Sequence, residues 1–297
     1  MRDRAVPPPY PAGIPMRKAS DLDADPGADL EGDLDADIHG DIHADIHELG
    51  RLIATSTDLV AFTGAGISTE SGIPDFRSPG GIWSRYRPID FREFVGSHEA
   101  RRETWRRRLG TGDTLAAARP NSGHQALALL HRRGVLRSVI TQNIDGLHQA
   151  SGIPADRVIE LHGNATYALC LSCKARYEIP PLLARFRETD EPPECACGGW
   201  IKSATISFGQ PMPEAAMQAA EHEARVSDVF LVLGTSLTVY PAAGYPRVAV
   251  QAGAKLAIVN RDPTDLDALA DVAIHGEIGP YLASAVASGQ AGSVESE

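Results

Sequence analysis

The chain has 297 residues and a hydrophobic content of 43%, which is typical of a globular protein with one large domain and a smaller one. No apolar run approaches the length of a membrane span, and the first 20 residues lack the apolar segment of a secretory signal. The net charge of −11 is concentrated in residues 1–48, which carry twelve acidic and four basic side chains. Composition therefore disfavours a membrane protein or a nucleic-acid-binding protein, and we expect a cytoplasmic one.

Residues 1–47 form an acidic, low-complexity tail that we expect to be disordered or helical. From Asp29 to Ile46 an Asp-apolar pair recurs every fourth residue, which places the apolar side chains on one helical face. Three histidines share this spacing, which allows a transition metal to be chelated. A solvated or partner-binding helix is the alternative for His39, His43 and His47.

Residues 58–77 carry the strongest local pattern. The apolar run Leu59–Phe62 predicts a buried strand, and it ends in Gly64-Ala65-Gly66. Two glycines one residue apart let the backbone approach a ligand closely, and a loop between a strand and a helix presents N–H groups to phosphate. A dinucleotide site is the first hypothesis and a plain tight turn the alternative. The third glycine of the dehydrogenase fingerprint would fall at Thr69, and Ser71–Arg77 predicts an ordered loop over the ligand.

The segment after residue 80 predicts helices as far as about Leu109, with one basic patch. We interpret this patch as a solvated helix face, with a substrate-docking surface as the alternative: Arg101, Arg102, Arg106, Arg107 and Arg108. Asn121–Arg133 also has helical spacing.

Two further segments carry polar candidate site residues, and the first of them follows a predicted strand. Ser138–Thr141 leads into Gln142-Asn143-Ile144-Asp145, where open α/β sheets put their ligand sites. Val158–Asn164 contains His162, whose ordinary pKa near neutrality suits a general base, although a structural role is the alternative. His148 is a candidate supporting residue of the site. We interpret the other histidines as packing or surface residues: His98, His124, His131, His222 and His275.

The four cysteines predict a metal site. Cys170-x-x-Cys173 and Cys195-x-Cys197 are separated by 21 residues, and two close thiolate pairs suit a tetrahedral structural Zn²⁺ ion. Two disulfides are the alternative, which the lack of a secretion signal disfavours. Four thiolates leave no open coordination position, so we expect one structural zinc ion per chain.

The remaining strands are expected in the last third of the chain. Ile201–Gln210 is expected to return to the main sheet as a half-buried strand. Val229–Leu233 and Leu256–Val259 predict two buried strands, which end in Gly234-Thr235-Ser236 and in Asn260-Arg261-Asp262. Asp271–Gly279 predicts a last strand, and residues 288–297 are expected to be disordered.

The string GAGISTESGIPDFR resembles the signature of the sirtuins, the NAD-dependent protein deacylases, in a bacterial type with a four-cysteine zinc site. The resemblance extends from about Leu49 to Leu282. It implies an α/β fold in which a doubly wound, Rossmann-like parallel sheet carries a smaller zinc-ribbon and helical-insert domain. The catalytic domain would span residues 48–287, with the core at about 48–80, 118–165 and 204–287, the helical insert at about 81–117 and the zinc-binding lobe at about 166–203.

The resemblance also implies the reaction. The acyl group of a protein lysine passes to ADP-ribose, nicotinamide is released and NAD⁺ is consumed. His162 inherits the role of general base, with Asn143 and Asp145 in the nicotinamide pocket. Protein ADP-ribosylation is the alternative activity, and an NAD-sensing module without catalysis is disfavoured by the intact set of these three residues. The expected partners are acylated-lysine proteins or peptides.

Site residues carry over position by position. The expected NAD⁺ contacts are Gly64, Ala65, Gly66, Ser68, Thr69, Asp75, Phe76, Arg77, Trp83, Gln142, Asn143, Ile144, Asp145, Gly234, Thr235, Ser236, Asn260, Arg261, Asp262 and Ile278, and the expected substrate contacts are Ile206, Phe208 and Gly209. Relatives that prefer acidic acyl groups carry a Tyr-x-x-Arg pair. Here Ile89 follows Tyr86 at that spacing, so we expect deacetylation. Gln210 in place of the usual Glu and the Cys-x-Cys spacing also depart from the family pattern.

Overall fold

The structure is a computed structural model that describes residues 31–291. Its centre is a six-stranded, all-parallel sheet with the strand order β3-β2-β1-β7-β8-β9. This order is that of doubly wound dinucleotide-binding folds, so the predicted fold class is confirmed. The strands are β1 (Leu59–Thr63), β2 (Leu136–Thr141), β3 (Val158–Glu160), β7 (Val229–Leu233), β8 (Lys255–Asn260) and β9 (Val272–His275).

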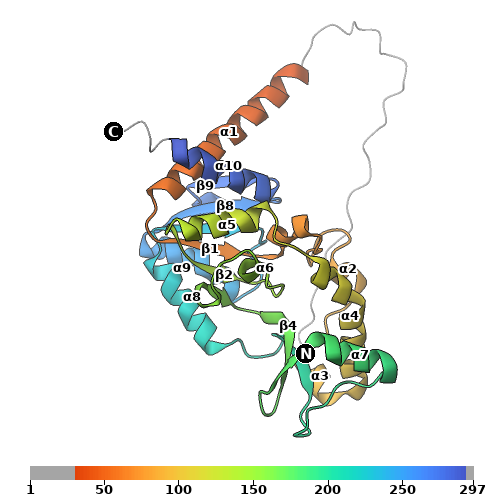
Figure 1. The fold of residues 1–297 in the computed structure, drawn as a ribbon. Coiled ribbons are helices and arrows are strands. Elements are labelled where there is room, and N and C mark those ends of the chain that lie inside the picture. Colours follow the sequence, from red (N-terminus) through yellow and green to blue (C-terminus); the bar gives the residue numbers. More distant parts are fainter. Residues whose placement is uncertain (1–30, 292–297) are drawn as a thin grey trace, which may run out of the picture. The chain divides into compact units, whose positions relative to one another are not determined.

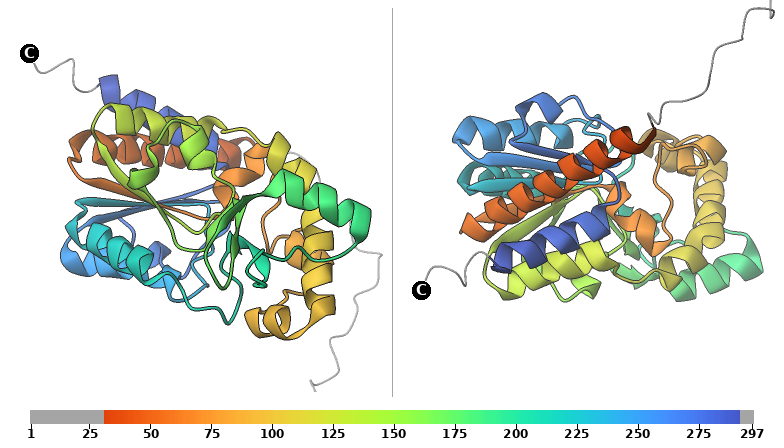
Figure 2. Two further views of the ribbon diagram at one scale, coloured as in Figure 1. Left: turned by 60° about the horizontal axis from the view of Figure 1, so that its bottom comes forward. Right: turned by 90° about the horizontal axis from the view of Figure 1, so that it is seen from above.

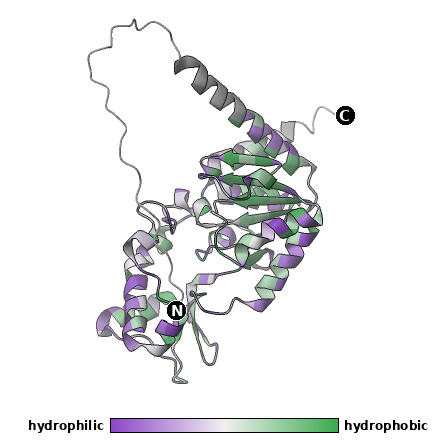
Figure 3. Cartoon of the chain, turned by 180° about the vertical axis from the view of Figure 1, so that it is seen from behind, coloured by the Kyte–Doolittle hydropathy of each residue, from purple (hydrophilic) through white to green (hydrophobic). Residues whose placement is uncertain are grey.

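Helices cover both faces of this sheet (Figure 1). Successive side chains of a strand point to opposite faces, and both faces of β1 are covered, so its residues from Leu59 to Phe62 are all apolar. Leu59 and Ala61 enter one core cluster, and Val60 and Phe62 enter the other. Figure 3 shows the same division, with hydrophobic strands between helices whose outer surfaces are more polar. The first face carries α1 (Glu31–Thr55), α5 (Ser122–Arg132) and α10 (Ile278–Ala291), and the second carries α8 (Glu214–Val226) and α9 (Tyr245–Ala252).

Both ends of the predicted domain extend further than expected. On α1, Ile46 is already buried in the core, ahead of the predicted start at residue 48. Helix α10 continues past residue 287 to Ala291 and lies beside α1 (Figure 2). A Cβ on Gly289 would lie 2.7 Å from the backbone oxygen of Gly50, so the two helices approach too closely for larger residues. The predicted tails 1–30 and 292–297 lie outside the described residues.

A smaller antiparallel sheet has the strand order β5-β4-β6. The prediction that Ile201–Gln210 returns to the main sheet is wrong, because β6 pairs with β4 and ends at Thr205. Beyond it the chain turns, with Gly209 at φ 75° and the Ser207 amide donating to Gln210 Oε1 over 3.2 Å. The elements of this lobe are β4 (Gly163–Cys170), β5 (Arg176–Glu178), β6 (Ile201–Thr205), α7 (Ile179–Thr189) and, from the helical insert, α2 (Ile82–Arg85), α3 (Phe91–Gly96) and α4 (His98–Ala117).

The basic patch on α4 is a solvated face only in part, because Arg106 is exposed as expected whereas Arg101 is not. Arg101 is buried, with its guanidinium 3.7 Å from the centre of the Trp200 ring, and it donates to the carbonyls of Phe94 and Val95. One turn further along, Trp105 is buried and donates to the Ile201 carbonyl over 3.2 Å. Positions four residues apart share a helix face, so this arginine points into the lobe with the tryptophan. Helical periodicity in the sequence does not reveal this burial, because a charged residue on a helix is ordinarily expected to face the solvent.

The short elements complete the chain. They are α6 (Leu147–Ala150) after β2 and four 3-10 helices: η1 (Ala65–Ser71), η2 (Ala155–Arg157), η3 (Ala242–Gly244) and η4 (Asp267–Leu269). Within residues 31–291, no helix combines the length and the apolar character that crossing a membrane requires.

Candidate active site

Two loops meet at the point where the strand order reverses, at the carboxyl ends of β1 and β7. The Gly64 amide donates to the Leu233 carbonyl over 3.0 Å, and the Gly66 amide to the Gly234 carbonyl over 2.8 Å. Gly234 has φ +65°, and a Cβ there would lie 2.3 Å from the Ile67 nitrogen. Glycine is therefore required by both backbone conformation and contact. In α/β sheets this switch point is where ligands bind.

A cavity of about 660 Å³ opens at this junction, a size suited to a dinucleotide-sized ligand. It is lined by every predicted NAD⁺ contact except Ser68 and Asp145, by the three predicted substrate contacts and by His162: Gly64, Ala65, Gly66, Thr69, Asp75, Phe76, Arg77, Trp83, Gln142, Asn143, Ile144, His162, Ile206, Phe208, Gly209, Gly234, Thr235, Ser236, Asn260, Arg261, Asp262 and Ile278.

Ser68 and Asp145 lie directly behind Asn143. The Asn143 amide nitrogen Nδ2 donates to the Gly64 carbonyl over 3.0 Å and to Ser68 Oγ over 3.1 Å. Ser68 Oγ in turn donates to Asp145 Oδ2 over 2.7 Å, and the other oxygen of Asp145 accepts from the Leu147 amide. The two residues therefore orient the side chain of Asn143, which itself faces the cavity.

His162 stands where the two lobes join, in the turn between β3 and β4. Its Nδ1 lies 3.0 Å from the Gln142 carbonyl, which can only accept, so Nδ1 carries the proton and Nε2 keeps a free lone pair. Burial lowers the pKa of His162, and the bond to Gln142 partly opposes that shift. The ring is therefore neutral at neutral pH, the state that a general base needs. The Ile206 amide donates to the His162 carbonyl and ties this turn to the segment after β6.

The loop from residue 72 to residue 83 covers one side of the cavity. Burial raises the pKa of Asp75, but hydrogen bonds from Ser78 and the Arg77 amide outweigh it and leave that pKa below the usual value. The Arg77 guanidinium donates to Ser236 and Thr238, so it bridges the loop to the segment after β7. These contacts fix the loop as an ordered cover, as its sequence predicted.

An aromatic wall lines the same side. The Trp83 ring lies 5.7 Å from the ring centres of both Phe76 and Phe208, and the Arg77 guanidinium lies 4.7 Å above it. Phe76 and Phe208 are both exposed, at 37% and 50%. Apolar side chains that stay accessible inside a cavity are suited to an apolar ligand group.

Sequence reasoning missed several lining residues. Glu70 lies within the motif that the sequence singled out, and Ser78 follows directly after it. Glu70 also accepts from the Gly279 amide at the start of α10. Arg261 donates to Ser78 over 2.7 Å, which links the end of β8 to the cover loop. Tyr240 and Pro241 follow the turn after β7 in a segment without a motif, so nothing local marked them.

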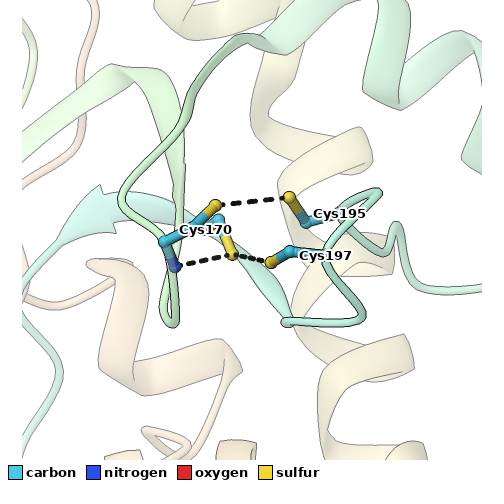
Figure 4. A group of neighbouring side chains, drawn as sticks. Cys170, Cys195 and Cys197 are labelled. Carbon is cyan, nitrogen blue, oxygen red and sulfur yellow. Dashed lines mark hydrogen bonds between the residues drawn. The ribbon is translucent and has the colours of Figure 1, made fainter.

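The four cysteines converge as predicted (Figure 4). All four sulfurs lie within 4.8 Å of one another, with Cys170 3.5 Å from Cys197 and Cys173 3.6 Å from Cys195. Tetrahedral Zn²⁺ with Zn–S bonds of about 2.3 Å places its sulfurs about 3.8 Å apart, so the residues fit the ion despite the tight Cys-x-Cys spacing. The Tyr177 hydroxyl donates to Cys195 Sγ over 3.0 Å.

The histidines of the acidic repeat show no such grouping. Among the described residues, the cysteines are the one set of potential ligands close enough to hold a metal ion. His43 and His47 are exposed on α1, and the side chain of His39 lies outside the described part.

Comparisons with known proteins agree with this site. The sequence profile of the Sir2 family matches residues 64–241. The "NAD-dependent protein deacetylase 1" of Bradyrhizobium diazoefficiens is 55% identical over 79% of this chain and 92% of its own length. A solved structure from "Structural Basis for the Mechanism and Regulation of Sir2 Enzymes" is 39% identical, covers 84% of this chain and 99% of its own, and has a TM-score of 0.74. A "Sir2-p53 peptide-NAD+" structure is 34% identical over 84% of this chain and 99% of its own, with a TM-score of 0.73.

Proposed function

The chain belongs to the Sir2 family and is an NAD-dependent protein deacylase, and we propose that His162 is its general base and Asn143 its nicotinamide-binding residue. It consumes NAD⁺ and carries a structural zinc ion. The observation that supports the assignment of the base is the contact of His162 Nδ1 with the Gln142 carbonyl, which leaves Nε2 of this cavity-lining residue with a free lone pair.

The proposed chemistry divides among the groups that line the cavity. Nicotinamide leaves the ribose as the acyl oxygen of the substrate attacks the anomeric carbon. His162 then takes a proton from a ribose hydroxyl through Nε2, so that the hydroxyl oxygen can attack the acyl carbon. Because this histidine is neutral at neutral pH, it is ready to accept that proton. Asn143 and Asp145 support the nicotinamide pocket, with Asp145 acting through Ser68, and Gln142 lies against the ribose.

We propose that the remaining cavity residues divide between NAD⁺ and substrate. The adenosine half lies along the ends of β7 and β8, from the Gly234–Ser236 turn to Asn260 and Ile278. The acyl-lysine enters beside Ile206, Phe208 and Gly209, next to the aromatic wall. A Sir2 structure bound to a myristoylated histone peptide supports an acylated peptide as partner.

We propose acetyl-lysine as the preferred acyl group. Tyr86 is exposed, and the Arg107 guanidinium lies 5.1 Å from its ring centre, so this tyrosine is engaged outside the cavity. Neither residue is among those that line the cavity. An acidic acyl chain would therefore find no Tyr-x-x-Arg pair.

The cellular setting is proposed as the cytoplasm, with proteins and not nucleic acids or membranes as substrates. Four thiols grouped as metal ligands suit a reducing compartment. We also propose residues 166–203 as the zinc-binding lobe, which includes most of the sheet β5-β4-β6, and residues 81–117 as the helical insert.

The test is nicotinamide release from NAD⁺ with an acetyl-lysine peptide that is followed by mass. The wild-type chain should release nicotinamide only with the peptide, and the peptide should lose its acetyl group; His162→Ala should do neither. An added ADP-ribose mass on a protein would instead indicate ADP-ribosyl transfer. Succinyl and long-chain peptides that react faster than acetyl would overturn the proposed acyl preference.

A further inference from the structure

Two histidines that the reaction does not use are buried behind the nicotinamide end of the cavity. His124 on α5 is 0% exposed and His148 on α6 is 1% exposed, and their ring centres lie 5.0 Å apart. Burying an imidazole costs free energy unless its ring nitrogens form hydrogen bonds, so the hydrogen bonds of these two rings indicate their role.

The hydrogen bonds of His148 fix its tautomer. Thr63 Oγ1 donates to Thr141 Oγ1 over 2.8 Å, which uses the single hydroxyl proton of Thr63. His148 Nε2 lies 2.8 Å from the same Thr63 oxygen, so Nε2 must be the donor. The other ring nitrogen, Nδ1, is buried and has no partner among the described residues.

His124 has Asn121 as its partner. Asn121 Nδ2 donates to the Ile67 carbonyl and to Ser71 Oγ, and Asn121 Oδ1 lies 3.0 Å from His124 Nδ1. The Asn121 backbone N–H also approaches the same Nδ1 over 3.4 Å as a capping-box donor, so these contacts do not fix one tautomer. His124 Nε2 is buried without a partner among the described residues, as Nδ1 of His148 is.

Both rings are therefore held neutral. A second proton would place a cation in a buried site without an acceptor, and burial lowers the pKa of His148 to about 3 and that of His124 to about 4. His124 lowers the pKa of His148 further, while Asp145 partly opposes the shift at His124. Neutral His148 stays a directional donor over the whole range in which the protein works.

The chain of bonds ends at the site. The Asn143 backbone N–H donates to Thr141 Oγ1 over 3.0 Å, on the same oxygen that Thr63 reaches. Thr63 and Thr141 are neighbours in register at the carboxyl ends of β1 and β2. The path runs from His148 through two threonine hydroxyls to the backbone of the residue that faces the cavity.

We propose that His148 is a positioning residue: its Nε2–H, acting through Thr63 and Thr141, fixes the backbone of Asn143 and so sets the affinity of the nicotinamide pocket. This inference rests on the proposed role of Asn143 in that pocket. The loss of one buried hydrogen bond should weaken nicotinamide binding about fivefold. The proposed peptide contacts Ile206, Phe208 and Gly209 take no part in this set of hydrogen bonds, so peptide binding should not respond.

Two amide substitutions of nearly equal size separate this role from simple packing. In His148→Gln the side-chain amide nitrogen can occupy the position of Nε2 and donate to Thr63, whereas in His148→Asn it is one methylene too short. We expect the Asn variant to raise both the KM for NAD⁺ and the nicotinamide inhibition constant about fivefold, with the KM for peptide unchanged, and the Gln variant to restore both to within about twofold of wild type. Equal impairment in the two variants overturns the proposal.

Nitrogen NMR of the wild-type chain tests the same point without a substitution. The His148 ring should show a protonated Nε2 and a bare Nδ1 from pH 8 down to about pH 5. An Nδ1–H tautomer, or a doubly protonated ring at pH 6, overturns the proposal even if the amide variants fail to fold. Failure of the proposed function is distinguished because wild type would then release no nicotinamide, whereas the tautomer would be unaffected.

Discussion

Gly234→Ala tests whether the junction of β1 and β7 requires a residue without a side chain at this position. Gly234 has φ +65°, a conformation that costs a residue with a Cβ about 1 kcal/mol. The added Cβ would also lie 2.3 Å from the Ile67 nitrogen and 2.7 Å from the Gly66 carbonyl carbon. Both are backbone atoms of η1 and its loop, so neither can turn aside as a side chain could. Overpacking of this kind costs a further 1–3 kcal/mol or so, and we expect a total loss of about 3 kcal/mol.

Gly253→Ala is the matched control. Gly253 ends α9 at φ +102°, and a Cβ there would meet no atom within 4 Å. The substitution should therefore cost only the free energy of placing alanine at a positive φ, about 1 kcal/mol. Urea unfolding of both variants gives the difference, and calorimetric titration with NAD⁺ shows whether the cavity survives. Because the same two loops form the floor of the cavity, Gly234→Ala should also lose NAD⁺ affinity, while Gly253→Ala should keep it. Equal unfolding free energies in the two variants would refute the reasoning.

Three further predictions concern pH, the zinc lobe and the insert. His124 and His148 have folded-state pKa values below the ordinary 6.5, so the unfolded chain binds more protons and their contribution to stability, fully present above about pH 6.5, is lost as pH falls. Urea titrations should show the unfolding free energy falling by about 2.4 kcal/mol between pH 6 and pH 5, and a flat profile there would contradict both pKa shifts. Tyr177→Phe removes the hydroxyl that donates to Cys195 Sγ, so a chelator should extract zinc about tenfold faster, as measured by a chromogenic assay. Tyr167→Phe is the control, and an unchanged rate of zinc release from Tyr177→Phe would mean that this hydrogen bond does not protect the site. Arg101→Lys should destabilise the chain by about 1–2 kcal/mol, because lysine cannot keep both hydrogen bonds to the carbonyls and the stacking on Trp200. Arg106→Lys changes an exposed side chain and should leave the stability nearly unchanged. Equal melting temperatures of the two variants would exclude a structural role for Arg101.

The parts of the site that sequence predicted well are those in which one short segment carries both the strand and its ligand groups. The run Leu59–Phe62 and the glycines after it are contiguous, and so are Ser138–Thr141 and the polar residues at 142–145. In a parallel sheet the carboxyl ends of strands meet at one edge, so each such segment places its own side chains at the site. The cysteine pairs were predicted equally well, because close spacing of thiolates in the sequence is itself a feature of zinc-binding sites.

The parts that sequence missed depend on contacts between distant segments. Ser68 and Asp145 were expected to touch the ligand, but they lie behind Asn143, a relation that exists only once β1 and β2 are paired. The alternation of polar and apolar residues in Ile201–Gln210 is compatible with any half-buried strand. It does not indicate which strand pairs with this segment, and in the structure that strand is β4. His124 was grouped with the packing residues, and only the packing of α5 against α6 places its ring beside His148.

The sequence by itself determined the order of strands and loops along the chain, the glycine turns, the cysteine pairs and many of the residues that line the cavity, because each is encoded in backbone conformation or local chemistry within a few residues. The tertiary structure alone decided which charged and polar side chains are buried, as with Arg101 on Trp200 and the two histidines behind Asn143. Burial is a property of what surrounds a residue after folding, and those surroundings come from segments far away in the chain. The same residue type can therefore be a solvated arginine or a structural one, and a surface histidine or a fixed donor.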